Sequence, residues 1–224
     1  MARLPRLALA GHAHWLLQRG LSGRPVFVDD IDREAYLAAL REAAAASSVR
    51  LHAFALADDA VHLVLTPAEA DGPSRMMQAL GRRYVSAHHR RHGGHGTLWD
   101  GRFRCAVVEP GASLLAVLLL VDGLAPGPGH SSAAHRSGRP ERRVPLVDPP
   151  EVWTLGNTPF ERETAWRRRL DEGLPAGQRA ALLDSVRGNW AVGSPAFARG
   201  LAESVARPTR PRPRGRPARV DGAR

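Results

Sequence analysis

Residues 49–66 (VRLHAFALADDAVHLVLT) determine the expected fold. Side chains alternate along 49–57, which predicts a strand with two faces. Residues 60–66 read as a second strand, and Asp58-Asp59 between them is a two-residue turn signal. The segment therefore predicts an antiparallel hairpin. In its first strand we expect one face to carry Val49, Leu51, Ala53, Ala55 and Ala57, and the other Arg50, His52, Phe54 and Leu56.

Further elements are expected on both sides of the hairpin. An apolar strand precedes it, followed by a helix that begins at the acidic pair Asp29-Asp30, where negative charge is favourable. After the hairpin we expect a helix capped by Ser74 and ended by Gly93, then an extended segment and an apolar helix. The order predicts an α+β protein with a ferredoxin-like split βαβ antiparallel sheet and packed helices. The expected ranges are 8–19, 30–48, 49–57, 60–66, 74–93, 97–110 and 112–121.

The composition changes after the last of these helices. Residues 1–125 are expected to form the main domain, and 126–157 are rich in Gly, Pro and Arg, as in a linker or a loosely packed strap. Residues 158–206 are predicted to form a small helical region. Residues 207–224 carry many arginines and prolines, which predicts a disordered basic tail. The helices of the third region are expected at 159–173, 176–190 and 195–206.

Composition and charge narrow the class of protein. The 224 residues are 43% hydrophobic, which excludes a wholly disordered chain, and no apolar run reaches the roughly 20 residues of a membrane helix. A single cysteine, Cys105, excludes a disulfide framework. We expect a cytoplasmic protein with no membrane partner. The 32 basic residues, all arginine, against 22 acidic ones give a net charge of +10, which favours a nucleic-acid partner over an inert basic surface.

Several stretches resemble the REP-associated tyrosine transposases, a transposase-like branch of the HUH single-strand nucleases. The most specific is Gly96–Arg104 (GTLWDGRFR), and the order of the blocks also matches. The resemblance covers nearly the whole chain and is clearest over 7–124. The other stretches are Leu7–Gly20, Val26–Leu40, His52–Pro67, Met77–Gly93, Gly188–Phe197 and Arg212–Pro217.

The resemblance implies binding of a DNA hairpin and cleavage of single-stranded DNA. Members of the family hold a divalent cation, Mg²⁺ or Mn²⁺, on two strand histidines that flank a hydrophobic residue, and a helix tyrosine attacks the phosphorus. Here the strand reads Ala60-Val61-His62, so His62 is at most half of a metal site or a lone polar residue. Leu120 stands at the expected nucleophile position, and no tyrosine follows Tyr84, which is a remote substitute with core packing as the alternative.

These departures predict a transposase-like protein that binds hairpin or single-stranded DNA, with nicking lost and no cofactor required. The alternative is an active metal-dependent single-strand endonuclease. It would need a site rebuilt from His62, Asp59 or His52, with water as the nucleophile. A decayed gene product without a role is the third possibility. The family contains monomers and dimers, so a homodimer stays open.

Arginines and aromatic residues provide the candidate DNA contacts. A predicted helix carries two basic stripes, suited to phosphates, while its His88–His92 pair has the spacing of a zinc site that the surrounding positive charge disfavours. Trp99 and Phe103 are candidates for base stacking or for capping the core. The tail resembles an AT-hook. The full set is Arg19, Arg82, Arg83, Arg90, Arg91, Trp99, Arg102, Phe103, Arg212, Arg214 and Arg216.

Overall fold

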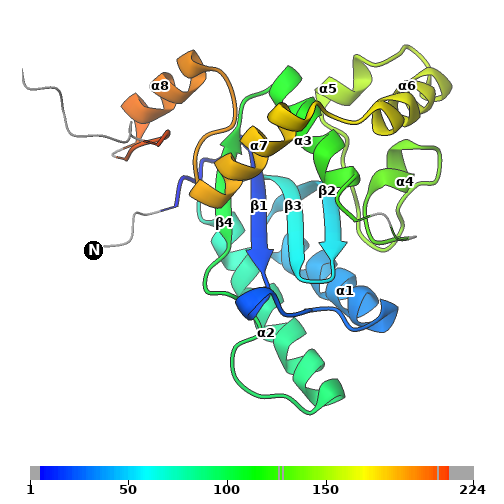
Figure 1. The fold of residues 1–224 in the computed structure, drawn as a ribbon, viewed down its shortest axis with the longest axis vertical. Helices are drawn as coiled ribbons and strands as arrows, with labels where there is room; N and C mark the ends of the chain where they lie inside the picture. The colour runs from blue at the N-terminus through cyan, green and yellow to red at the C-terminus, as the bar shows by residue number, and fades with distance from the viewer. Residues whose placement is uncertain (1–5, 126, 128, 206, 212–224) are drawn as a thin grey trace, which may run out of the picture.

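A four-stranded antiparallel sheet forms the centre of the protein (Figure 1). The computed structural model describes residues 6–125, 127, 129–205 and 207–211. The strand order β2-β3-β1-β4 is that of a ferredoxin-like split βαβ sheet, so the predicted fold class is confirmed. The strands are β1 (Ala13–Arg19), β2 (Val49–Ala57), β3 (Ala60–Pro67) and β4 (Arg104–Val108).

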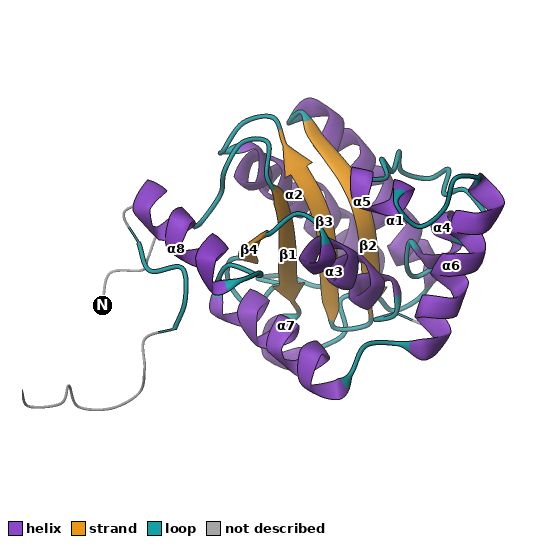
Figure 2. Cartoon of the chain, turned by 90° about the horizontal axis from the view of Figure 1, so that it is seen from above, coloured by secondary structure: helices purple, strands orange, loops and turns teal. Residues whose placement is uncertain are grey.

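Helices cover both faces of the sheet (Figure 2). On one face lie α1 (Asp30–Ala46) and α2 (Gly72–His92), and on the other α3 (Ala112–Asp122) and α7 (Ala176–Gly188). Each face therefore has its own buried apolar cluster. The shorter or more peripheral helices are η1 (Leu21–Gly23), α4 (Ala133–Arg136), α5 (Pro150–Trp153), α6 (Pro159–Glu172) and α8 (Pro195–Ser204).

Several expected boundaries are wrong. The first strand begins at Ala13 rather than at residue 8, and the extended segment 97–110 contains a strand only over 104–108. Helix α2 begins at Gly72, before Ser74, because Pro73 is well suited to the first helical turn. Ser74 therefore lies inside the helix, where its hydroxyl accepts from Arg6.

The predicted alternation of β2 is also wrong at its start. A register shift between Leu51 and Ala53 inserts an extra residue, and such a bulge moves the following side chains to the other face. Val49 and Leu51 consequently join Phe54 in the cluster beneath α1 and α2, while Ala53 lies in the opposite cluster.

The described part of the predicted linker, from residue 129 to residue 157, packs against the edge of the sheet as a strap. Buried Arg136 on α4 forms an ion pair with buried Asp122 at the end of α3, with a 3.2 Å separation. Asp122 also accepts from Trp166 of α6, and the hydroxyl of Ser132 contacts it. Isolated bridges pair Leu51 with Leu146 and Ala55 with Ser131. The strap thus joins β2 to α3 and α6 through a buried polar network.

The start of the predicted tail is packed rather than disordered. Thr209 is buried, its hydroxyl donates to the carbonyl of Ala198 at 2.6 Å, and its own carbonyl accepts from the amide of Ala191. These bonds hold the segment after α8 against the loop that follows α7. The AT-hook-like arginines Arg212, Arg214 and Arg216 lie outside the described residues.

Candidate functional site on the sheet

His62 lies on the face of the sheet that α3 and α7 cover. Its neighbours at i−2 and i+2, Ala60 and Val64, belong to the cluster on that face. The ring is buried, and its Nδ1 accepts a 3.2 Å hydrogen bond from Trp15 Nε1. Burial lowers the pKa of His62 to about 3, with further lowering by the charges of Arg187 and Arg19. His62 is therefore a neutral imidazole in the core at neutral pH.

The strand register defines which side chains accompany His62 on this face. His62 pairs with Ala55 on β2 and with Leu17 on β1, and Leu17 pairs in turn with Arg104 on β4. A single row across the sheet therefore reads Ala55, His62, Leu17, Arg104. One step further along, Ala60 lies opposite Arg19.

Leu120 approaches the same face from α3, as the sequence predicts for the nucleophile position. It is 5% exposed and belongs to the apolar cluster that also contains Ala60 and Leu17. Leucine has no oxygen to attack phosphorus, and its burial here is that of a core residue. Helix α3 is apolar on nearly all sides because it lies between this sheet face and the segments around it.

The residues at this position do not fit a divalent cation. Ala60 has no donor atom, and the Nδ1 lone pair of His62 is used by Trp15. His52, proposed for a rebuilt site, has both nitrogens engaged, with the carbonyl of Val147 at 2.6 Å and the hydroxyl of Thr66 at 2.8 Å. Asp59 lies 3.6 Å from Arg19 in an exposed ion pair. We therefore derive no metal-dependent step on this face.

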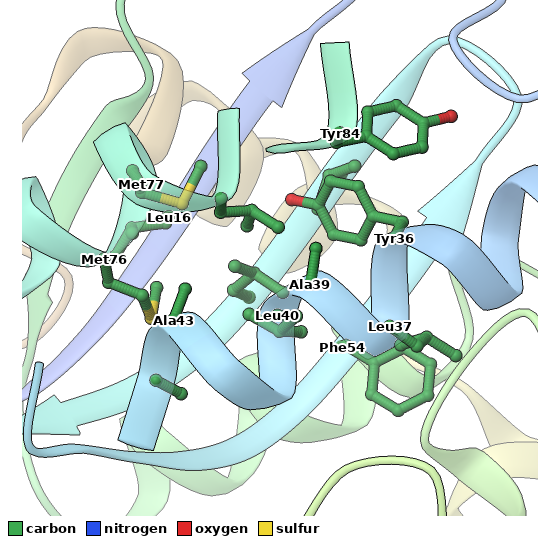
Figure 3. Close-up of a cluster of buried hydrophobic side chains, with 14 of the residues drawn as sticks. Leu16, Tyr36, Leu37, Ala39, Leu40, Ala43, Phe54, Met76, Met77 and Tyr84 are labelled. Atoms are coloured by element: carbon green, nitrogen blue, oxygen red, sulfur yellow. The ribbon is translucent and has the colours of Figure 1, made fainter. Parts of the chain in front are cut away.

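Tyr84 lies on the other side of the sheet. It packs with Tyr36 in the cluster beneath α1 and α2 (Figure 3), with ring centroids 5.1 Å apart. Its hydroxyl is buried and donates to the carbonyl of Val26. The core interpretation of Tyr84 agrees with this position, because the whole sheet separates it from His62.

The comparisons with known proteins give the fold. Neither a model of a known protein family nor a curated protein matches the sequence. Among solved structures, a REP-associated tyrosine transposase bound to a REP hairpin matches with a TM-score of 0.51 and 12% identity, over 66% of this chain and 93% of that one. The chain has the fold of a REP-associated tyrosine transposase. A Deinococcus radiodurans protein provisionally described as a transposase matches with a TM-score of 0.38 and 24% identity, over 49% of this chain and 88% of that one.

The arginines of α2 differ in how free they are within this transposase fold. Arg91 is held by Asp29 and Asp32 near the start of α1, and Arg83 lies 2.6 Å from Glu42. Among the described residues, Arg90 has only a long 3.5 Å contact, with Ser86. The side chain of Arg82 is exposed and has no ion pair within the described part of the chain. Of the α2 arginines, Arg82 and Arg90 would therefore lose the fewest existing interactions on contacting a phosphate.

Trp99 and Phe103 are placed in the core, not on the surface. Trp99 is 6% exposed and packs against Tyr36 and Tyr84. Phe103 is 7% exposed, and the guanidinium of Arg6 covers its ring at 3.9 Å. Stacking on a nucleobase would require either ring to leave these contacts. Arg102, which lies between Trp99 and Phe103 in the sequence, is exposed.

Three arginines surround the His62 end of the sheet, and we call them the basic rim. They are Arg19 at the end of β1, Arg104 at the start of β4 and Arg187 near the end of α7. The side chains of Arg19 and Arg187 are 52% and 56% exposed, and both lie close enough to lower the pKa of His62. The sequence indicated Arg19 but missed Arg104 and Arg187. Alternation along β4 would have placed Arg104 beside Leu17. No local sequence pattern, however, indicates that α7, which carries Arg187, packs on this face of the sheet.

None of the helices in the described ranges is long and apolar enough to cross a membrane.

Proposed function

We propose that the chain is a DNA-binding protein with a transposase fold that holds hairpin or single-stranded DNA without cutting it. The observation that carries the proposal is the composition of the sheet face around His62. Alanine, leucine and a neutral buried histidine stand where cleavage needs metal ligands and a tyrosine, and arginines stand around them.

The basic rim supports a phosphate-binding role for this region. Guanidinium groups form charge-assisted hydrogen bonds with phosphate oxygens. Arg104 is exposed and has no ion pair inside the described ranges, while Arg187 has only a 3.5 Å contact with Asp184 on its own helix. A phosphate at the rim would therefore displace few existing interactions. The net charge of +10 adds long-range attraction for DNA.

The solved neighbour provides the probe. That protein was bound to a REP hairpin, so a REP hairpin with a single-stranded extension is the first DNA to test. The full chain is incubated with the labelled probe and Mg²⁺ or Mn²⁺, and the products are run on a native gel and on a denaturing gel with SDS. We expect retention on the native gel and uncut, unlinked DNA on the denaturing gel. A cut without an adduct would support the alternative of an active single-strand endonuclease with a rebuilt site and water as the nucleophile, whereas a covalent adduct would reveal a nucleophilic side chain elsewhere in the chain.

A matched pair of triple variants tests the basic rim. The first replaces Arg19, Arg104 and Arg187 with alanine, and the second replaces the exposed α6 residues Arg167, Arg168 and Arg169, so both remove three positive charges. Each lost phosphate contact lowers the slope of log affinity against log salt by about 0.7–0.9. We expect the rim variant to lower this slope by about 2 and the α6 variant to change it much less. Equal effects of the two variants would place the DNA elsewhere.

A further inference from the structure

Three side chains that could bind a metal meet between α1 and α2, away from the His62 face. Asp32 belongs to the first turn of α1, and His88 and His92 are one turn apart at the end of α2. One ligand atom from each residue lies within 4.8 Å of the others. His92 Nε2 is 3.0 Å from both carboxylate oxygens of Asp32, and the two imidazole centroids are 4.6 Å apart.

The surroundings of His88 do not explain why this position carries a polar ring. Both of its ring nitrogens are buried, and neither has a hydrogen-bond partner within the described residues. An unsatisfied buried polar atom destabilises the fold, so two such atoms on one ring call for an explanation. The ring packs against Tyr84 on one side and His92 on the other, which an apolar residue could do as well.

We propose that Asp32, His88 and His92 form a zinc-binding site that links α1 to α2. Two imidazoles and a carboxylate are a ligand set typical of Zn²⁺ with three protein ligands. Mg²⁺ is a weaker candidate because it prefers oxygen ligands. The side chain of His92 is 24% exposed, which provides an entry path and leaves the fourth position to a solvent molecule.

The existing distances are close to those of a zinc site. With Zn–N and Zn–O bonds near 2.0–2.1 Å, tetrahedral geometry separates ligand atoms by about 3.3 Å. The 3.0 Å contact between His92 and Asp32 is close to this separation, and the ligand atom of His88, within 4.8 Å of the other two, would have to move closer to them. A metal would replace the hydrogen bond between His92 Nε2 and Asp32, and the single proton of the neutral His92 ring would then lie on Nδ1, which leaves Nε2 free to bind the metal.

The neighbouring arginine does not block the site. Arg91 Nη1 lies 2.6 Å from Asp32 Oδ1, but the same guanidinium also contacts both carboxylate oxygens of Asp29. With both histidines neutral, the two aspartates and one arginine sum to a charge of −1. A divalent cation therefore meets a negative site, despite the basic surroundings of α2.

Zinc binding by the untagged full chain tests the proposal. After treatment with a chelator and its removal, the protein is titrated with Zn²⁺ by calorimetry, with Mg²⁺ as a comparison. Co²⁺ is added separately, because a tetrahedral site gives it an intense visible absorption. We expect one Zn²⁺ per chain, a tetrahedral Co²⁺ spectrum and a melting temperature that rises with Zn²⁺.

Histidine variants distinguish this site from adventitious binding. His92→Ala and His88→Phe should each weaken zinc binding at least tenfold and abolish the thermal shift. The exposed His95 lies three residues beyond the cluster, and His95→Ala should leave both unchanged. His88→Phe keeps a ring against Tyr84, so it tests the site even if His92→Ala fails to fold. Absence of zinc binding by the folded chain, or equal binding by His88→Phe and His95→Ala, would overturn the proposal.

Discussion

Replacing His62 with asparagine should remove one acid-dependent loss of stability. In the folded protein the ring is buried and its pKa is lowered to about 3, from an ordinary value of 6.5. Below pH 6.5 the unfolded chain therefore binds a proton at this residue that the folded chain does not bind. Stability is unaffected well above pH 6.5 and falls as the pH decreases below it. The asparagine side chain in His62→Asn does not titrate, and its amide oxygen can still accept from Trp15 Nε1.

The size of the effect follows from the two pKa values. At pH 5 the unfolded chain gains about 2 kcal/mol from protonating one histidine with an ordinary pKa of 6.5, and at pH 7.5 it gains almost nothing. The folded chain, with a pKa near 3, gains almost nothing at either pH. His14 has its pKa lowered to about 4 by burial, but it is present in both proteins, so its contribution cancels.

Urea unfolding at pH 7.5 and pH 5, followed by circular dichroism, measures this difference. The wild type should lose about 2 kcal/mol more than His62→Asn on going from pH 7.5 to pH 5. The exposed His95 gives the matched control, His95→Asn, which should behave as the wild type. If His62→Asn lost as much stability as the wild type, His62 would be protonated in the folded state. The ring would then reach solvent, and the face would be open as a nuclease site requires.

Three further changes test the same interpretation of the two sheet faces. Leu120→Tyr should destabilise the protein by about 1–3 kcal/mol in urea unfolding, because it overfills a packed position, and should give no covalent DNA adduct on a gel with SDS. Tyr84→Phe should cost about 1 kcal/mol from the lost bond to Val26, with retention of hairpin DNA unchanged in a native gel. Asp122→Ala should cost about 3–5 kcal/mol in urea unfolding, because it leaves the guanidinium of Arg136 buried without its partner.

The sequence was sufficient for the parts of the fold that depend on local patterns. The hairpin formed by β2 and β3 was predicted from alternation and from the Asp58-Asp59 turn, and Gly93 ends α2 in the left-handed conformation expected of a C-cap. The bulge between Leu51 and Ala53 was missed because it arises from pairing with β3, which no local signal reports. The packing of 126–157 was left open for a similar reason. Its Gly- and Pro-rich composition resembles that of a linker, whereas its buried ion pair joins residues on separate elements.

Interactions between distant residues limited the prediction of the candidate sites. The departures from the resembling family's pattern at Ala60 and Leu120 are visible in the sequence, and the structure places both residues in one apolar cluster. The basic stripes on α2 were also visible, but the carboxylates that hold Arg91 come from α1, about 60 residues earlier. The same separation hid Asp32 from the His88–His92 pair. The spacing of four residues indicates that His88 and His92 lie on one face of α2. The third candidate ligand, Asp32, is brought to them only by the packing of α1 against α2.

The chemistry of the basic rim is compatible with the proposed function, in which DNA is bound but not cleaved. Arginines hold a phosphate in its ground state by charge and hydrogen bonds, which is the role that we propose for Arg19, Arg104 and Arg187. Cleavage also requires an attacking atom and stabilisation that increases as the bond breaks, since binding the ground and transition states equally does not accelerate the reaction. Leu120 offers no attacking atom, and His62 is turned to Trp15. In the proposed function, a face without metal ligands and nucleophile gives no rate enhancement, while the phosphate contacts still contribute to affinity.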